Sequence, residues 1–144
     1  MARRSAVAAF ALAALLHAPA PAQSQGVVRV DVMMIQLSKQ PGPIDPRAQR
    51  LHEKLHAQFR YESLRVLQRE RLSLAVDELA SLQLPNGRTF RLRPLNLGES
   101  SVLLAVSVEG TLQTDMRIGN HKIVAIRAGR FEEGSLVISL EPDF

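Results

Sequence analysis

Apolar residues recur along this chain with a spacing that changes from segment to segment. A first apolar run, without interruption, occupies residues 6–16, and a second run, rich in β-branched residues but interrupted by Arg29, Asp31 and Gln36, occupies residues 27–37. The second run is largely apolar at both alternating sets of positions, as in a strand whose two faces are covered. We therefore expect a buried strand over residues 27–37.

A helical spacing follows this strand. Asp45 and Pro46 form a helix-start signal, because aspartate accepts hydrogen bonds from free amides and proline suits the first helical turn. Apolar residues then recur at helical spacing, at Ala48, Leu51, Leu55 and Phe59. This pattern predicts one N-terminal amphipathic helix over about residues 46–59.

After Tyr61 the period of the apolar positions becomes two, which is typical of half-buried strands. Asn86-Gly87 predicts a type I′ hairpin turn, because both residues accept positive φ angles. Two apolar residues on the return strand are expected to face the core and two arginines the solvent: Phe90 and Leu92, and Arg91 and Arg93. Further glycines mark turns at regular intervals. The sequence thus predicts a mainly β fold, an antiparallel sandwich or small barrel of about seven to eight strands.

The first apolar run has the layout of a secretory signal peptide. Arg3 and Arg4 precede it, and the small residues Ala22 and Ser24 suit cleavage before Gln25. The run would rise only about 16 Å as a helix, against roughly 30 Å of membrane hydrocarbon, so a retained anchor is not expected. We expect a cleaved signal peptide over residues 1–24 and a single β-rich domain over residues 25–144. The mature chain would be periplasmic or extracellular, with no membrane span.

Composition narrows the class of partner. Without Arg3 and Arg4, 16 of the 18 basic residues remain against 14 acidic ones, a balance that does not favour nucleic acid. The chain contains no cysteine, so no disulfide or thiol contributes to its stability or chemistry. It contains no tryptophan either, which disfavours an aromatic platform for carbohydrate.

One segment of the predicted helix matches a zinc-site motif. Residues 52–56 have the H-E-x-x-H spacing, which places two imidazoles one helical turn apart. In a minimal zinc-dependent hydrolase, His52 and His56 would be the metal ligands and Glu53 the general base.

Other features of the sequence oppose this zinc hypothesis. Lys54 puts a charge inside the motif, and no Gly-x-x-His extension supplies a third ligand. Glu70 and Glu78 are candidate ligands by distance alone. We interpret the motif as a chance match and expect no cofactor, with zinc as the alternative.

The C-terminal segment suggests a second alternative. Phe144 follows an alternating apolar run, an arrangement similar to the closing strand of outer-membrane barrels. Such barrels carry aromatic girdles, however, and the aromatic residues of the mature chain are too few to build them. A small outer-membrane β-barrel is therefore kept only as a second alternative.

Three segments resemble a class of small uncharacterised exported bacterial β-rich proteins: Ile44-Asp45-Pro46-Arg47, Phe59-Arg60-Tyr61 and residues 134–140. The resemblance implies a secreted β domain and carries over no catalytic residue. Our leading hypothesis is a non-enzymatic exported module of the cell envelope, with a binding or structural role. Its partner would be another protein or an envelope component. The oligomeric state is left open by the sequence.

Overall fold

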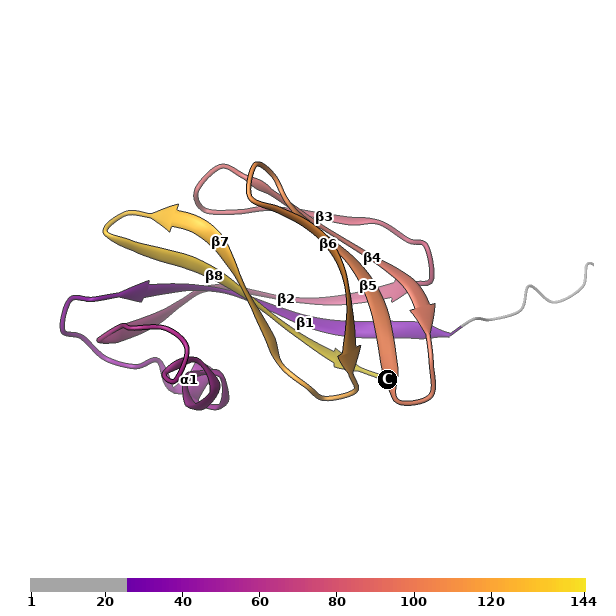
Figure 1. Ribbon diagram of the computed structural model, residues 1–144, viewed down its shortest axis with the longest axis horizontal. Coiled ribbons are helices and arrows are strands. Elements are labelled where there is room, and N and C mark those ends of the chain that lie inside the picture. Colours follow the sequence, from indigo (N-terminus) through magenta and orange to yellow (C-terminus); the bar gives the residue numbers. More distant parts are fainter. Residues whose placement is uncertain (1–25) are drawn as a thin grey trace, which may run out of the picture.

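The computed structural model describes residues 26–144, which form two four-stranded antiparallel sheets in a sandwich-like arrangement (Figure 1). The mainly β fold with eight strands agrees with the sequence-based prediction. The predicted signal peptide over residues 1–24 and its cleavage site before Gln25 lie outside the described residues. Between residues 26 and 144, no helix has the length and apolar character needed to cross a membrane.

Sheet A has the strand order β2-β1-β8-β7, and sheet B has the order β3-β4-β5-β6. The strands of sheet A are β1 (Val27–Ser38), β2 (Ser63–Ala75), β7 (Val124–Phe131) and β8 (Gly134–Asp143). The strands of sheet B are β3 (Ala80–Gln83), β4 (Thr89–Leu97), β5 (Ser101–Val108) and β6 (Leu112–Gly119). A 3-10 turn (Pro46–Ala48) and helix α1 (Gln49–Leu55) lie between β1 and β2.

The main hydrophobic core lies between the two sheets. Every second residue of β1 points into it, beginning with Val28, Val30, Val32 and Met34. From sheet B, Phe90 and Leu92 are fully buried while Arg91 and Arg93 are exposed, which confirms the predicted orientation of this strand. Alternation with a period of two therefore places one face of β4 in the core, as the sequence indicates.

A second core lies on the outer face of sheet A, under α1. The 3-10 turn contributes Ala48 and the helix contributes Leu51 and Leu55. They are buried against residues of three strands: Ile35, Leu37, Leu64, Val66 and Val137. Figure 1 shows α1 beneath sheet A, on the side opposite sheet B. Because sheet A is covered on both faces at this end, β1 and β8 are apolar at consecutive positions there.

The helix predicted over residues 46–59 is not N-terminal and is shorter than predicted. It follows β1, the strand that the sequence pattern also placed before it, and its α-helical part ends at Leu55. The chain must reverse direction to enter β2 at Ser63, so it bends after Leu55. Gln58 and Phe59 both donate their backbone N–H to the Leu55 carbonyl, at 2.9 and 2.8 Å. Phe59 still packs on the second core, but from this bend.

The predicted β3–β4 hairpin is confirmed, but its type I′ turn is wrong. Gly87 has a φ of +83°, whereas Asn86 is not among the non-glycine residues of the described chain that have positive φ. Gly87 donates its N–H to the Leu84 carbonyl at 2.9 Å, which puts Pro85 and Asn86 at the centre of the turn. Proline favours this arrangement because its φ is fixed near −65°.

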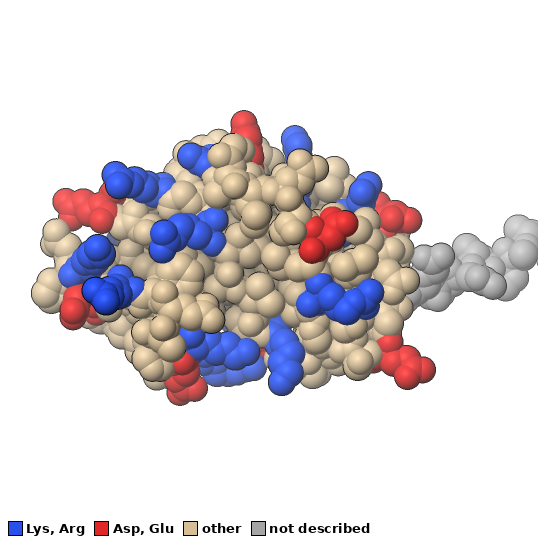
Figure 2. Space-filling view, viewed as in Figure 1, with Lys and Arg blue, Asp and Glu red and all other residues tan. Residues whose placement is uncertain are grey.

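Charged side chains are spread over the molecular surface. On the face in Figure 2, Lys and Arg are interspersed with Asp and Glu instead of forming one continuous patch of a single sign.

Candidate binding cleft

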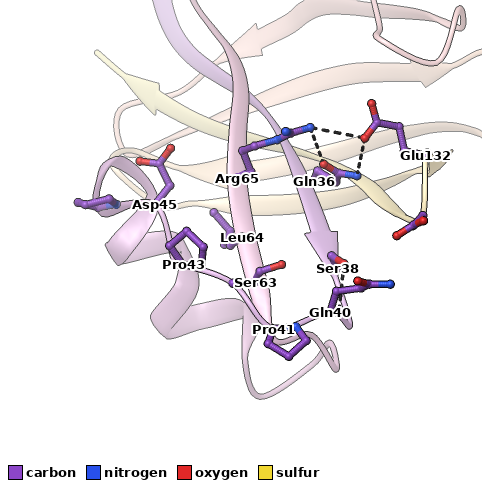
Figure 3. Close-up of a pocket in the computed structure, with 13 residues that line it drawn as sticks. Gln36, Ser38, Gln40, Pro41, Pro43, Asp45, Ser63, Leu64, Arg65 and Glu132 are labelled. Atoms are coloured by element: carbon purple, nitrogen blue, oxygen red, sulfur yellow. Dashed lines mark hydrogen bonds and ion pairs between the residues drawn. The ribbon is translucent and has the colours of Figure 1, made fainter.

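A cleft of about 790 Å³ opens at the end of sheet A that carries the β7–β8 turn (Figure 3). Its walls come from the end of β1, the segment 40–46 that leads to the helix, the start of β2, and the β7–β8 turn. The lining combines three proline rings with eight polar or charged side chains. Segments far apart in the sequence therefore meet at one site.

Gln36 is the buried polar residue at the base of the cleft and is only 9% exposed. It is the next inward-facing position of β1 after Met34, at the point where the apolar series of the main core stops. Its Oε1 accepts a hydrogen bond from Arg65 Nη2 at 2.8 Å. Its Nε2 donates to the Phe131 carbonyl at 3.2 Å and lies 3.5 Å from Glu132 Oε2. Both ends of the side-chain amide are thus held in place.

Arg65 reaches the cleft because β2 contains a bulge. The β1–β2 register shifts by one residue between Met34 and Ile35, so that Leu67 has no partner. A one-residue shift moves all following side chains to the opposite face of the sheet. On the helix side of the bulge, Arg65 therefore points into the cleft beside Gln36, and its neighbours Leu64 and Val66 point into the second core.

Asp45 forms the wall on the helix side. It caps the 3-10 turn by accepting the Arg47 backbone N–H at 3.0 Å, and it pairs with the Arg47 guanidinium at 2.7 Å. These bonds from Arg47, with a weaker one from the Val66 N–H, lower the pKa of Asp45 to about 2. Its backbone N–H donates to the Leu64 carbonyl at 2.9 Å, and the Leu64 N–H donates to Pro43 at 3.2 Å. The wall is thereby attached to the edge of β2.

The β7–β8 turn forms the opposite wall. Glu132 has a positive φ of 52°, and its carboxylate lies 3.6 Å from Arg65 Nη2. Glu133 lines the same wall. Gly134 packs so tightly on β1 that a Cβ atom there would lie 2.3 Å from the Leu37 carbonyl oxygen. Only glycine fits at this corner, and its close approach brings Glu132 over Gln36 and Arg65.

The histidine motif lies on α1 and does not line this cleft. His52 Nδ1 is 2.6 Å from the Tyr61 hydroxyl, and His56 Nδ1 is 3.0 Å from the His52 carbonyl oxygen. The two ring centroids are 5.5 Å apart, and Glu53 is exposed. Burial raises the pKa of Tyr61, so its hydroxyl stays protonated at neutral pH and can donate.

The two glutamates considered as third ligands are engaged elsewhere. Glu70 accepts a hydrogen bond from Gln68 Nε2 at 2.9 Å, and Glu78 accepts the Ala75 backbone N–H at 2.9 Å. Over residues 26–144, no three His, Asp or Glu side chains are grouped so as to hold a metal ion. The zinc hypothesis for His52, Glu53 and His56 remains to be tested by measurement.

Sequence reasoning did not find the cleft residues Gln36, Arg65 and Glu132. One signal was present: Gln36 is the polar residue in the otherwise apolar stretch of residues 32–37, and a buried polar residue needs hydrogen-bond partners. The partners themselves could not be named, because they lie 29 and 96 residues away along the chain.

Comparison of the chain with protein-family models, with curated protein sequences and with solved structures gives no match, so its function is argued from the geometry of the cleft.

Proposed function

We propose that this chain is a non-enzymatic exported module that binds a polypeptide segment of another envelope protein in the cleft beside Gln36. The observation that carries the proposal is the hydrogen-bonded set of Gln36, Arg65 and Glu132. Three separate segments bring these side chains together, and hydrogen bonds and an ion pair join them. Preorganised polar groups of this kind reduce the entropic cost of binding.

The size and lining of the cleft support a polypeptide ligand. Its volume of about 790 Å³ lies in the range of ligand sites, which are typically apolar with a few placed polar groups. Pro41 and Pro43 give it rigid apolar walls. Arg65 uses one nitrogen on Gln36 and has further N–H groups for ligand carbonyls, while Glu132 and Glu133 can accept ligand amides. Adjacent donors and acceptors match the alternating groups of a peptide backbone.

The chemistry of the lining favours binding over catalysis. The titratable side chains around the cleft are Asp45, Arg65, Glu132 and Glu133, and none of them is paired with a histidine or lysine that could activate a nucleophile. The pKa of Asp45 is about 2, so its carboxylate is a weak base at neutral pH. These groups are suited to hydrogen bonding and ion pairing.

Export of the module is supported by the signal-peptide features of residues 1–24. N-terminal sequencing of the protein from the envelope fraction tests this part. We expect a chain that begins at or near Gln25, and a retained Met1 or residence in the cytoplasm would contradict it.

A site-specific photo-crosslinker tests the cleft itself. Placed at Gln40 on the cleft rim, it should capture a protein partner in intact cells, whereas the same group at Ser81 on β3 should not. Substituting Arg65→Glu in the Gln40 background should abolish the adduct, because it removes the donors and adds a third carboxylate beside Glu132 and Glu133. Arg91→Glu, an equal charge change on the exposed face of β4, serves as the control. Adducts that are equal at both positions, or that survive Arg65→Glu, would contradict the proposal.

A further inference from the structure

The sandwich has four sheet edges, formed by β2 and β7 in sheet A and by β3 and β6 in sheet B. An edge strand presents unpaired backbone N–H and C=O groups that can pair with another chain. Proteins protect such edges with short strands, bulges, inward-pointing polar groups or a covering segment. The four edges of this molecule differ in this respect.

Both halves of the β2 edge are protected. Near the cleft, the segment leading to the helix covers the edge, because both the N–H and the carbonyl of Leu64 are bonded to it. Farther along, Gln68 and Glu70 lie opposite Met34 and Val32, and so are on the side of sheet A that faces sheet B, where Gln68 remains exposed at the edge. Inward-pointing polar side chains of this kind disfavour the addition of another strand.

The β7 and β3 edges are protected in other ways. β7 carries a bulge at Ala128, and the Asn86 side chain donates to two of its carbonyls, those of Ala128 at 3.0 Å and Arg130 at 3.4 Å. β3 has only four residues. Neither edge offers a long, regular row of free backbone groups.

The β6 edge has none of these protections. It is eight residues long, contains no proline, and pairs with β5 without a register shift. Its inward-facing residues are Leu112, Thr114, Met116 and Ile118, of which the first three are only half buried. Within residues 26–144 the opposite edge of β6 pairs with no other strand. A regular edge with partly exposed apolar side chains is a surface suited to strand pairing.

We propose that β6 pairs antiparallel with β6 of a second copy of this chain, across a two-fold axis at Met116. The two sheets B would then form one continuous eight-stranded sheet. This inference does not depend on ligand binding in the cleft, which lies at the end of sheet A. A two-fold contact of this kind uses the same surface on both copies.

Charge complementarity supports pairing with a second copy of the chain in this register. Asp115 and Arg117 are exposed on the outer face of β6, and neither belongs to an ion pair within residues 26–144. Arg117 donates to the Ser101 hydroxyl at 3.1 Å, an exposed contact. With the axis at Met116, Asp115 lies opposite Arg117 of the second copy, and this pairing occurs twice. Opposite charges directly across an antiparallel pair are stabilising.

The neighbouring registers are unfavourable. An axis at Asp115 would place two aspartates opposite each other, and an axis at Arg117 would place two arginines opposite each other. In the proposed register the two Met116 side chains lie next to each other on the inward-facing side of the paired β6 strands, and Thr114 of each copy lies opposite Ile118 of the other.

Charge reversal tests the pairing by sedimentation equilibrium of the purified full chain, as processed by the cell. We expect the unmodified protein to dimerise reversibly. Asp115→Arg alone and Arg117→Asp alone should each weaken dimerisation at least about tenfold, because each creates two like-charge contacts. The combined swap Asp115→Arg with Arg117→Asp should restore it, since the opposite charges face each other again. Arg93→Asp on β4, which faces the same side of sheet B, is the matched control and should leave dimerisation unchanged.

A single introduced cysteine tests the register, since the chain has no cysteine of its own. Met116→Cys lies on the axis, where the two thiols would be within disulfide distance, and it should form a cross-linked dimer on mild oxidation. Leu112→Cys on the same strand should not, because eight residues of strand, roughly 27 Å, separate its two copies in this register. Thermal melts of each variant show whether the fold is retained.

Three results would overturn the proposal. The first is an unmodified protein that stays monomeric at concentrations up to about 0.5 mM. The second is a combined swap that dimerises no better than the single reversals. The third is cross-linking through Leu112→Cys in place of Met116→Cys.

Discussion

Sheets A and B have four strands each, but they differ in how many of their faces are buried. In β8 of sheet A, five consecutive residues, Leu136 to Leu140, are buried, because the main core lies on one side and the second core on the other. In β5 of sheet B, fully buried residues strictly alternate with half-exposed ones. A continuous apolar run therefore marks the doubly covered sheet, and alternation marks the sheet with one free face.

The difference also explains where the cleft lies. Sheet A needs cover on both faces, and it receives the helix only at one end. At that end the inward series of β1 changes from apolar residues to Gln36, whose polar partners close the sandwich in place of a hydrophobic core. The cleft thus lies at the end of sheet A where the inward-facing apolar series of β1 ends at Gln36.

The largest expected effect comes from the tight corner of sheet A. Gly134→Ala should lower the free energy of unfolding by about 3 kcal/mol, because the added methyl group would overlap the Leu37 carbonyl. Gly110→Ala in the β5–β6 turn of sheet B has space for the methyl group and meets only the strain of a positive φ, so it should cost about 1 kcal/mol. Urea unfolding of both variants measures the difference. Equal losses would mean that the corner of sheet A can relax.

Matched truncations on the outer faces test the burial difference directly. Val137→Ala in sheet A should cost about 2 kcal/mol, since Val137 is fully buried under the second core. Leu103→Ala in sheet B removes more carbon atoms but should cost less than about 1 kcal/mol, because Leu103 is half exposed. Urea unfolding of the two variants gives the ranking. A larger loss for Leu103→Ala would show that something covers the outer face of sheet B.

An intermediate effect is expected for the Asn86 side chain, which links sheet B to sheet A by a hydrogen bond to β7. Asn86→Asp keeps the oxygen that accepts the Arg88 N–H but removes the donor to the Ala128 carbonyl of β7. We expect a loss of about 1 kcal/mol from the unpaired carbonyl and its repulsion by the carboxylate. Gln83→Glu on β3, whose side chain makes only an exposed 3.4 Å contact with Thr89, should be near neutral. Thermal melts at low protein concentration compare the two, and equal melting temperatures would remove Asn86 as a link between the sheets.

The helical cover of sheet A can be tested at His52. From the sequence alone, replacing both histidines should cost no stability, but the contact with Tyr61 changes that expectation. His52→Ala should cost about 1 kcal/mol through the lost partly buried hydrogen bond, and the exposed His56→Ala should cost less. Elemental analysis of the same preparations tests the zinc hypothesis, for which we expect no stoichiometric metal. Tightly held zinc that either substitution abolishes would favour the hydrolase alternative.

The smallest effect is a pH dependence at the Asp45 wall. Its folded-state pKa is lowered from the usual 3.8 to about 2 by its bonds from Arg47. The folded carboxyl therefore binds its proton more weakly than the unfolded one. Its contribution to stability is complete above about pH 4 and is lost as the pH falls toward 2. Unfolding midpoints over this range should fall less steeply for Asp45→Asn than for the unmodified protein, and parallel curves would contradict the assignment.

The sequence by itself determined the class of fold and the orientation of several strands. A period of two is sufficient to place Phe90 and Leu92 inside and Arg91 and Arg93 outside, because successive side chains of a strand face opposite ways. The apolar run of β1 likewise indicated a strand with two covered faces, which holds for residues 34–37, whereas the outward-facing residues of the first half are exposed or half-exposed. These properties depend on neighbouring residues only.

Tertiary structure decided the features that depend on distant segments. The helix ends at Leu55 because the chain must turn into β2, although Phe59 continues the helical spacing. The bulge at Leu67 exchanges the faces of β2 and sends Arg65 into the cleft, and no local pattern records it. Gln36 meets Glu132 only because the first and last strands pair at the centre of sheet A. A periodic pattern reports which side of an element is buried, but the identity of the groups that meet there is set by the pairing of strands.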